Sequence, residues 1–145
     1  MGNLFAWISL CFCGGVFGAL ANSVLVWMAG AYGWTAAMGV AIAPEWTLPW
    51  LYQRLVWGGL WGLVFAPRFM PNSCLWRGLL VSIGPTLAQL LIVFPNQLGK
   101  GYWGLELGNL TPLVVVVANA VWGWAAAAWI MGGDDNRHGY GRRLR

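Results

Sequence analysis

Residues 53–62 read QRLVWGGLWG, which places an arginine at the start of an apolar run rich in glycine and tryptophan. Residues 119–128 read NAVWGWAAAA and repeat the Val-Trp-Gly phrase. The whole chain of 145 residues is 59% hydrophobic and 8% charged, whereas soluble domains carry roughly 25% charged residues. We therefore expect an all-α membrane protein, with helices at these two runs and at the other apolar stretches of the chain.

Four apolar stretches are long enough to cross a bilayer, which takes about 17 to 25 residues. They predict a single membrane domain, residues 1–145, with transmembrane helices at about 4–28, 50–66, 77–94 and 111–131. Ala19-Leu20-Ala21 resembles a signal-peptide cleavage site, but the start lacks positive residues and the apolar stretch continues to Met28. We expect the first stretch to be a retained helix.

Basic residues predict how the chain is oriented. Arg68 and Arg77 flank the second connection, and four arginines lie in the tail, residues 132–145. Because positive residues favour the cytoplasmic side, we expect both termini and the second connection there. Topology explains the basic tail without a nucleic-acid partner, and contact with anionic lipid head groups is the alternative.

The two apolar phrases suggest a duplication. Val56–Gly58 returns at Val121–Gly123, and Gly18 falls opposite Gly84 in the preceding helices. This pattern predicts two tandem helix hairpins related by an axis along the membrane normal. Chance recurrence of glycine, leucine and tryptophan is the alternative.

Small residues recur at helical spacing in each predicted helix, where they allow close backbone approach in lipid. The four stripes are Gly14, Gly18 and Asn22; Arg54, Gly58, Gly62 and Ala66; Gly78, Ser82 and Thr86; and Asn119, Gly123 and Ala127. They predict a tight four-helix bundle. Pro85 interrupts the third helix, where we expect a kink because proline lacks the backbone donor.

Each predicted helix contributes one polar side chain at a similar depth in the outer half of the bilayer: Asn22, Arg54, Gln89 and Asn119. An arginine in a membrane helix is costly, so it needs partners. Glu45 and Glu106 precede the second and fourth helices and are candidate counter-ions; snorkelling of Arg54 to the head groups is equally simple. The functional alternative is an outer pocket that holds an anionic head group, a quinone-like carbonyl or a polar group of a partner.

Twelve tryptophans in so short a chain make contact with another protein plausible. Trp57, Trp61, Trp122 and Trp124 lie too deep for the interfacial aromatic belt. They are the candidate partner-contact residues.

Catalytic and cofactor signatures are missing from the sequence. His138, the single histidine, lies in the tail near Asp134 and Asp135, a group more typical of a solvated segment than of a metal site. Cys11 and Cys13 are two apart and point to different sides of a helix, as small apolar residues do. We expect a non-enzymatic protein without cofactor or metal.

Three motifs resemble a known family: Leu75–Leu80 (LWRGLL), Leu87–Leu90 (LAQL) and Pro95. They are similar to a stretch of the YagU-like small inner-membrane proteins of bacteria, over the second half of the chain. The resemblance implies a multi-pass protein of the bacterial inner membrane and supplies no site residues.

Two functions follow from these patterns. The first is an accessory or assembly subunit that packs within a larger membrane complex through its tryptophans, or that self-associates. The alternative is a small carrier or channel for an anion or polar solute that works as a homo-oligomer.

Overall fold

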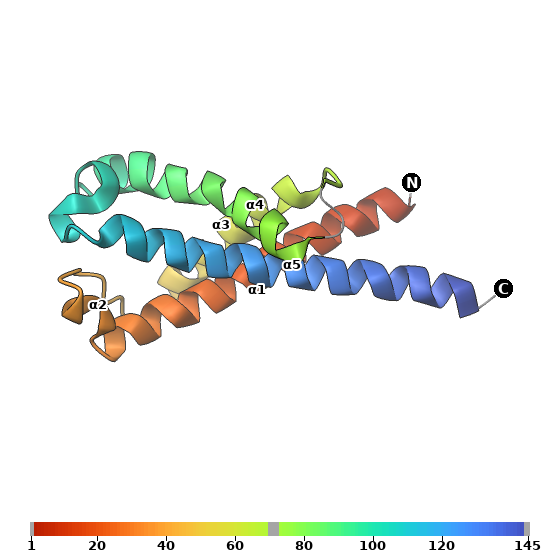
Figure 1. Cartoon of the computed structure of the whole chain (residues 1–145), viewed down its shortest axis with the longest axis horizontal. Coiled ribbons are helices and arrows are strands. Elements are labelled where there is room, and N and C mark those ends of the chain that lie inside the picture. The colour runs from red at the N-terminus through yellow and green to blue at the C-terminus, as the bar shows by residue number, and fades with distance from the viewer. Residues whose placement is uncertain (1, 70–72, 144–145) are drawn as a thin grey trace.

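The computed structural model describes residues 2–69 and 73–143, and every regular element in these ranges is helical (Figure 1). Side chains are described for residues 4–69 and 73–134. The basic side chains of the tail, and the predicted solvated group of His138 and Asp135, lie outside the described residues.

Three helical segments are long and apolar enough to cross a membrane, which is typical of an integral membrane protein. They belong to α1 (Gly2–Ala31), to α4 (Cys74–Ala88) with its continuation η2 (Gln89–Gln97), and to α5 (Thr111–Arg143). Three of the four predicted spans are thus confirmed in position and character.

The fourth predicted span is shorter than expected. Helix α3 covers Leu48–Gly62 and then tightens into the 3-10 turn η1 (Leu63–Phe65). Its 15 residues rise about 22 Å, against a hydrocarbon core of about 30 Å. Whether α3 crosses the membrane stays a prediction, because length alone does not require it.

Local sequence sets the helix starts. Pro49 lies in the first turn of α3, where a missing backbone donor costs nothing. Ser73 precedes α4, and its Oγ accepts a hydrogen bond from the backbone N–H of Trp76. Pro85 lies inside α4, and the helix widens to π geometry four residues later, at Gln89.

The helices pack in the order α3, α1, α5, α4. Helix α1 lies between α3 and α5, and α5 lies between α1 and α4, whereas α3 and α4 do not pack along their lengths. Helix α1 begins and α5 ends at one end of the molecule (Figure 1). The connections that contain α2 (Trp34–Ala37) and η3 (Tyr102–Leu107) lie at the other end.

Each hairpin closes on a pair of glycines. A Cβ added at Gly78 would lie 2.7 Å from the carbonyl oxygen of Gly123, and one added at Gly58 would lie 2.9 Å from that of Gly15. The first pair joins α4 to α5 and the second joins α3 to α1. Both helix pairs therefore meet through glycines, and the tandem repeat of hairpins stays a prediction.

A single methyl group at Gly123 should therefore weaken the second hairpin. The Cβ of Gly123→Ala would meet the backbone carbonyl of Gly78, which cannot move without separating the helices. We expect a loss of about 1 to 3 kcal/mol in the free energy of unfolding, measured by thermal or denaturant unfolding in detergent. Gly132→Ala in the same helix meets open space and should leave stability unchanged or slightly higher; equal losses in both variants would contradict the packing argument.

Candidate functional site

The four polar residues predicted at one depth come together at the centre of the bundle. Arg54 donates to the side-chain oxygen of Asn22, and Asn22 Nδ2 lies 3.4 Å from Asn119 Oδ1. Asn119 Nδ2 in turn lies 3.4 Å from Gln89 Oε1. A continuous polar chain therefore runs from α3 through α1 and α5 to the end of α4.

The polar chain follows the hairpin pairing. Arg54 and Asn22 join α3 to α1. Asn119 and Gln89 join α5 to the α4 segment, which is α4 together with its continuation η2. The amide of Asn22 also donates to the backbone oxygen of Ala118 at 2.6 Å, which ties the two hairpins together. Asn22 and Asn119 are 5% and 7% exposed, so these bonds form away from the surface of the bundle.

Neutral groups hold the guanidinium of Arg54. Its Nε donates to Ser23 Oγ at 2.9 Å, its Nη2 donates to Asn22, and its Cζ lies 4.9 Å from the centre of the Trp50 ring. A guanidinium has five N–H donors, so three remain beyond these two bonds. The positive charge is therefore oriented by its partners but not neutralised by them.

The predicted counter-ions do not contact Arg54. Glu45 lies in the connection before α3, Glu106 lies in η3, and both are exposed. Among the described residues, the one ion pair joins Arg68 to Asp134, at 3.9 Å and at the other end of the bundle. The expectation that Glu45 or Glu106 folds back on Arg54 is thus wrong, since the side chains bonded to Arg54 are Asn22 and Ser23 on α1.

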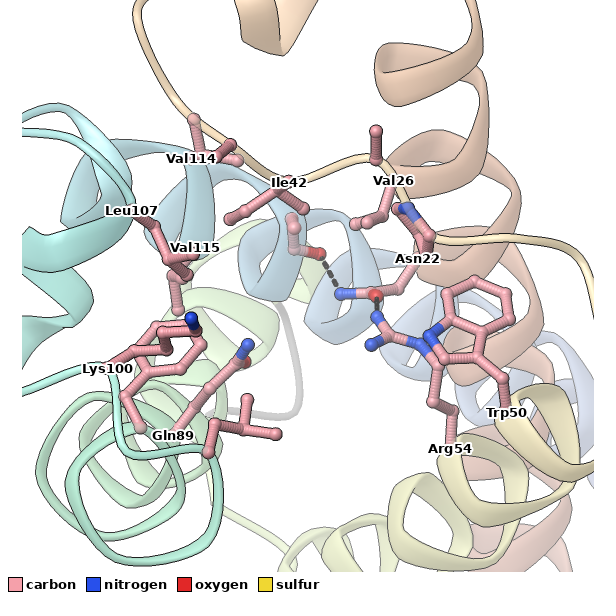
Figure 2. A pocket seen from close by; sticks show the side chains of 16 residues that line it. Asn22, Val26, Ile42, Trp50, Arg54, Gln89, Lys100, Leu107, Val114 and Val115 are labelled. Carbon is pink, nitrogen blue, oxygen red and sulfur yellow. Dashed lines mark hydrogen bonds between the residues drawn. The ribbon is translucent and has the colours of Figure 1, made fainter.

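A pocket of about 370 Å³ opens beside the polar chain. Figure 2 shows Arg54, Trp50 and Asn22 on one side of it and Gln89 and Lys100 on the other. The rest of the lining is apolar: Val26, Ala41, Ile42, Ala43, Pro44, Phe94, Leu98, Leu107, Val114, Val115 and Ala118. This size and composition suit a small-molecule site.

The polar groups that remain free at the pocket are donors. Asn22 uses its oxygen for Arg54 and its amide for α5, whereas Gln89 accepts from Asn119 and keeps its NH2 group. Lys100 brings a second positive charge, and no carboxylate lines the pocket. An acceptor group on a ligand would match these side chains, and the charges favour an anion.

Sequence reasoning missed two contributors to the site. Ser23 follows Asn22 directly, and two adjacent polar residues inside an apolar helix were the signal for it. Lys100 lies in the connection after the third predicted helix, apart in sequence from the four predicted polar residues. Its approach to the pocket depends on the turn that the chain makes after η2, where the backbone N–H of Lys100 bonds to the backbone oxygen of Phe94. No sequence pattern predicts that turn.

The four candidate tryptophans differ in how far they are exposed. Trp57 and Trp124 are exposed on the bundle, at 56% and 40% of their surface. Trp122 is 3% exposed and donates its ring N–H to the backbone oxygen of Gly15 at 3.0 Å. Trp61 is half-buried, with its ring against Gly84. Trp122 as a partner-contact residue is therefore wrong, since it packs between α1 and α5.

The remaining candidate groups are a metal site and the cysteines. Among residues 4–69 and 73–134, no group of three or more His, Cys, Asp or Glu side chains is placed to hold a metal ion. Cys11 is buried in the apolar core beside Trp7 and Phe65, while Cys13 is exposed.

Comparisons with protein-family models, with curated proteins and with solved structures found no match to this chain. The resemblance to YagU-like proteins stays a prediction.

Asn22 should prove to be energetically coupled to Arg54. In Asn22→Leu the guanidinium loses an acceptor, and we expect the free energy of unfolding to fall by about 2 kcal/mol, as for a hydrogen bond to a charged group. The double variant Arg54→Met with Asn22→Leu should lose less than the sum of the single variants. A double-mutant cycle by thermal unfolding in detergent measures this. Gln53→Leu, on the exposed face of α3, is the control, and strictly additive losses would refute the coupling.

Proposed function

We propose that this protein is a non-enzymatic integral membrane protein that binds an anionic molecule at Arg54. One observation carries the proposal: a guanidinium held by two neutral acceptors turns its remaining donors toward a pocket that no carboxylate lines. No carboxylate among the described residues bonds to Arg54, so an anionic ligand would be its acidic partner.

The cost of placing Arg54 among apolar helices supports the same conclusion. A charged side chain at the centre of a membrane helix costs about 2.5 to 3.5 kcal/mol on insertion scales. Asn22 and Ser23 offset part of this cost through hydrogen bonds and leave the net charge unchanged. An anion in the pocket would offset more of it, so the free site attracts negative charge.

The proposed setting is the bacterial inner membrane, with α3 as a fourth crossing segment. Helix α3 packs against α1 along its length, and its exposed apolar side chains, among them Trp57 and Leu60, favour that placement. With Arg68 and the basic tail on the cytoplasmic side, both termini are cytoplasmic and the pocket lies in the outer leaflet. A homo-oligomeric anion carrier would use the same site and would also need a path to the opposite side.

Arg54 should control anion binding. The probes are inorganic phosphate and dodecyl phosphate, titrated into the purified protein in a neutral detergent, with dodecanol as the uncharged match. We expect at least one anionic probe to raise the thermal midpoint by several degrees, because a ligand at 100 times its Kd stabilises by about 2.7 kcal/mol. Arg54→Gln should abolish the shift, and Arg54→Lys should weaken the affinity about tenfold because lysine lacks the planar fork.

The matched control is Arg68→Gln, which removes one positive charge at the other end of the bundle. It should keep the wild-type response. If Arg54→Gln responds to both anions as the wild type does, or if neither anion shifts the wild type, the proposed function is wrong.

A second candidate function is an accessory or assembly subunit of a larger membrane complex. It is favoured by the exposed tryptophans of α3, α4 and α5, which are Trp57, Trp76, Trp124 and Trp129. Aromatic side chains are enriched where proteins meet. Such a subunit would present some of these tryptophans to a partner and keep the Arg54 pocket for a ligand or for a polar group of the partner.

Substitution of exposed tryptophans should separate partner contact from folding. Trp57→Leu and Trp76→Leu should keep the thermal midpoint close to the wild-type value and lose any subunits that co-purify stoichiometrically from native membranes. Trp122→Leu should instead lower stability, because Trp122 fills the α1–α5 contact. Quantitative mass spectrometry of the purified material measures the co-purifying chains. If both exposed-site variants retain the wild-type set, or if no chain co-purifies with the wild type, the subunit role is excluded.

A further inference from the structure

The pocket has a roof made by the two connections at its end of the bundle. The backbone N–H of Ala41 donates to the backbone oxygen of Leu107 at 2.7 Å, and Gly108 lies directly against the carbonyl of Gly39. Gly108 has a φ of 139°, which lets the chain make this close approach without a side chain. The first and third connections are therefore tied together over the pocket.

Three sides of the pocket are closed by helix packing. Helix α1 packs against α3, α5 packs against α4, and α1 and α5 pack against each other behind the site. The remaining side lies between α3 and α4, which do not pack along their lengths. The Trp61 ring against Gly84 marks where these two helices meet. The least obstructed approach to Arg54 is thus sideways, between α3 and α4.

The two helices on either side of this approach are suited to lipid rather than to water. The large apolar side chains exposed on α3 and on the α4 segment are Leu48, Val56, Trp57, Leu60, Leu75, Trp76, Leu80, Ile83, Leu87, Leu91 and Ile92. The α4 segment is also one of the three apolar enough to cross a bilayer. A molecule that enters between these helices comes from the hydrocarbon layer.

We propose that the ligand is a membrane phospholipid with an anionic head group, which enters between α3 and α4. Its phosphate lies against Arg54, Gln89 and Lys100, and its acyl chains stay among the apolar side chains and the surrounding bilayer. This inference rests on the proposed function and names the ligand class and its route.

The chemistry of the lining favours a lipid phosphate over a free one. The donors stand on opposite sides of the pocket, with Arg54 on one side and Gln89 and Lys100 on the other (Figure 2). Arg54 and Gln89 belong to helices, whereas Lys100 belongs to the connection after η2. A phosphate presents several acceptor oxygens and suits donors from more than one direction. The other walls are apolar, and they match acyl and glycerol carbons better than the hydration shell of an inorganic ion.

The test compares four ligands on the full-length protein in neutral detergent. They are phosphatidylglycerol, phosphatidylcholine, glycerol 3-phosphate and inorganic phosphate, followed by thermal unfolding and by native mass spectrometry of bound lipid. We expect a saturable rise of several degrees with phosphatidylglycerol and at least tenfold weaker binding of phosphatidylcholine. Neither soluble phosphate should shift the midpoint at millimolar concentration.

Matched variants locate the binding. Arg54→Gln should lose the phosphatidylglycerol response, Lys100→Gln should weaken it several-fold, and Arg68→Gln should retain it. An equal response in Arg54→Gln and Arg68→Gln would mean lipid bound around the bundle rather than in the pocket, and would overturn the inference. Equal affinity for the two lipids would overturn it as well.

The outcomes also separate this inference from the function on which it rests. If the soluble phosphates bind through Arg54 as tightly as phosphatidylglycerol, the lipid ligand is wrong and anion binding stands. If dodecyl phosphate stabilises through Arg54 and phosphatidylglycerol does not, the phospholipid is again excluded and anion binding stands. If none of these anions binds through Arg54, both proposals fail.

Discussion

Direct backbone contact between glycines is the constraint on which this fold depends. Lipid offers no hydrophobic drive for helix association, so helices in a membrane hold together by close packing and polar bonds. Gly15 with Gly58, and Gly78 with Gly123, bring the backbones of each hairpin together with no side chain between them. The seam between hairpins uses the same device, because a Cβ at Gly18 would lie 2.5 Å from the carbonyl oxygen of Trp122. Once these three seams are set, the order α3, α1, α5, α4 follows.

The polar chain is a consequence of the same close packing. Asn22 reaches a backbone oxygen of α5 because α1 and α5 approach closely, and it reaches Arg54 because α3 lies against the other side of α1. Asn22 and Asn119 each serve both as donor and as acceptor, which spares their buried polar atoms the cost of an unmet bond. Arg54 differs from Asn119, its counterpart in the repeat, by carrying a charge with donors to spare. The positive charge of the site therefore comes from Arg54, which has a neutral amide at the corresponding place in the second hairpin.

Much of this arrangement could be predicted from the sequence, and the failures have identifiable physical causes. One polar residue per helix at a common depth was enough to group Asn22, Arg54, Gln89 and Asn119, because antiparallel helices in a bundle share their depths. The sequence did not reveal the π geometry of Gln89–Gln97, because Pro85 predicts a break in the helix without specifying its form. Spacing also does not say which side of a helix a neighbour covers. The repeated phrase gave Trp57 and Trp122 the same local context, yet only Trp122 is enclosed.

The α1–α5 seam and the α3–α4 seam differ in how closely their helices approach, and this difference leaves room for the pocket. In the α1–α5 seam, Gly18 meets the methyl group of Ala126, and so small a side chain allows the backbones to touch. In the repeat, Ala126 corresponds to Trp61, whose ring lies against Gly84 on α4. An indole in place of a methyl group holds α3 and α4 apart, since close-packed side chains cannot be compressed. The α3–α4 seam is thus less closely packed than the α1–α5 seam, and Arg54 of α3 and Gln89 at the end of α4 line the pocket on this side.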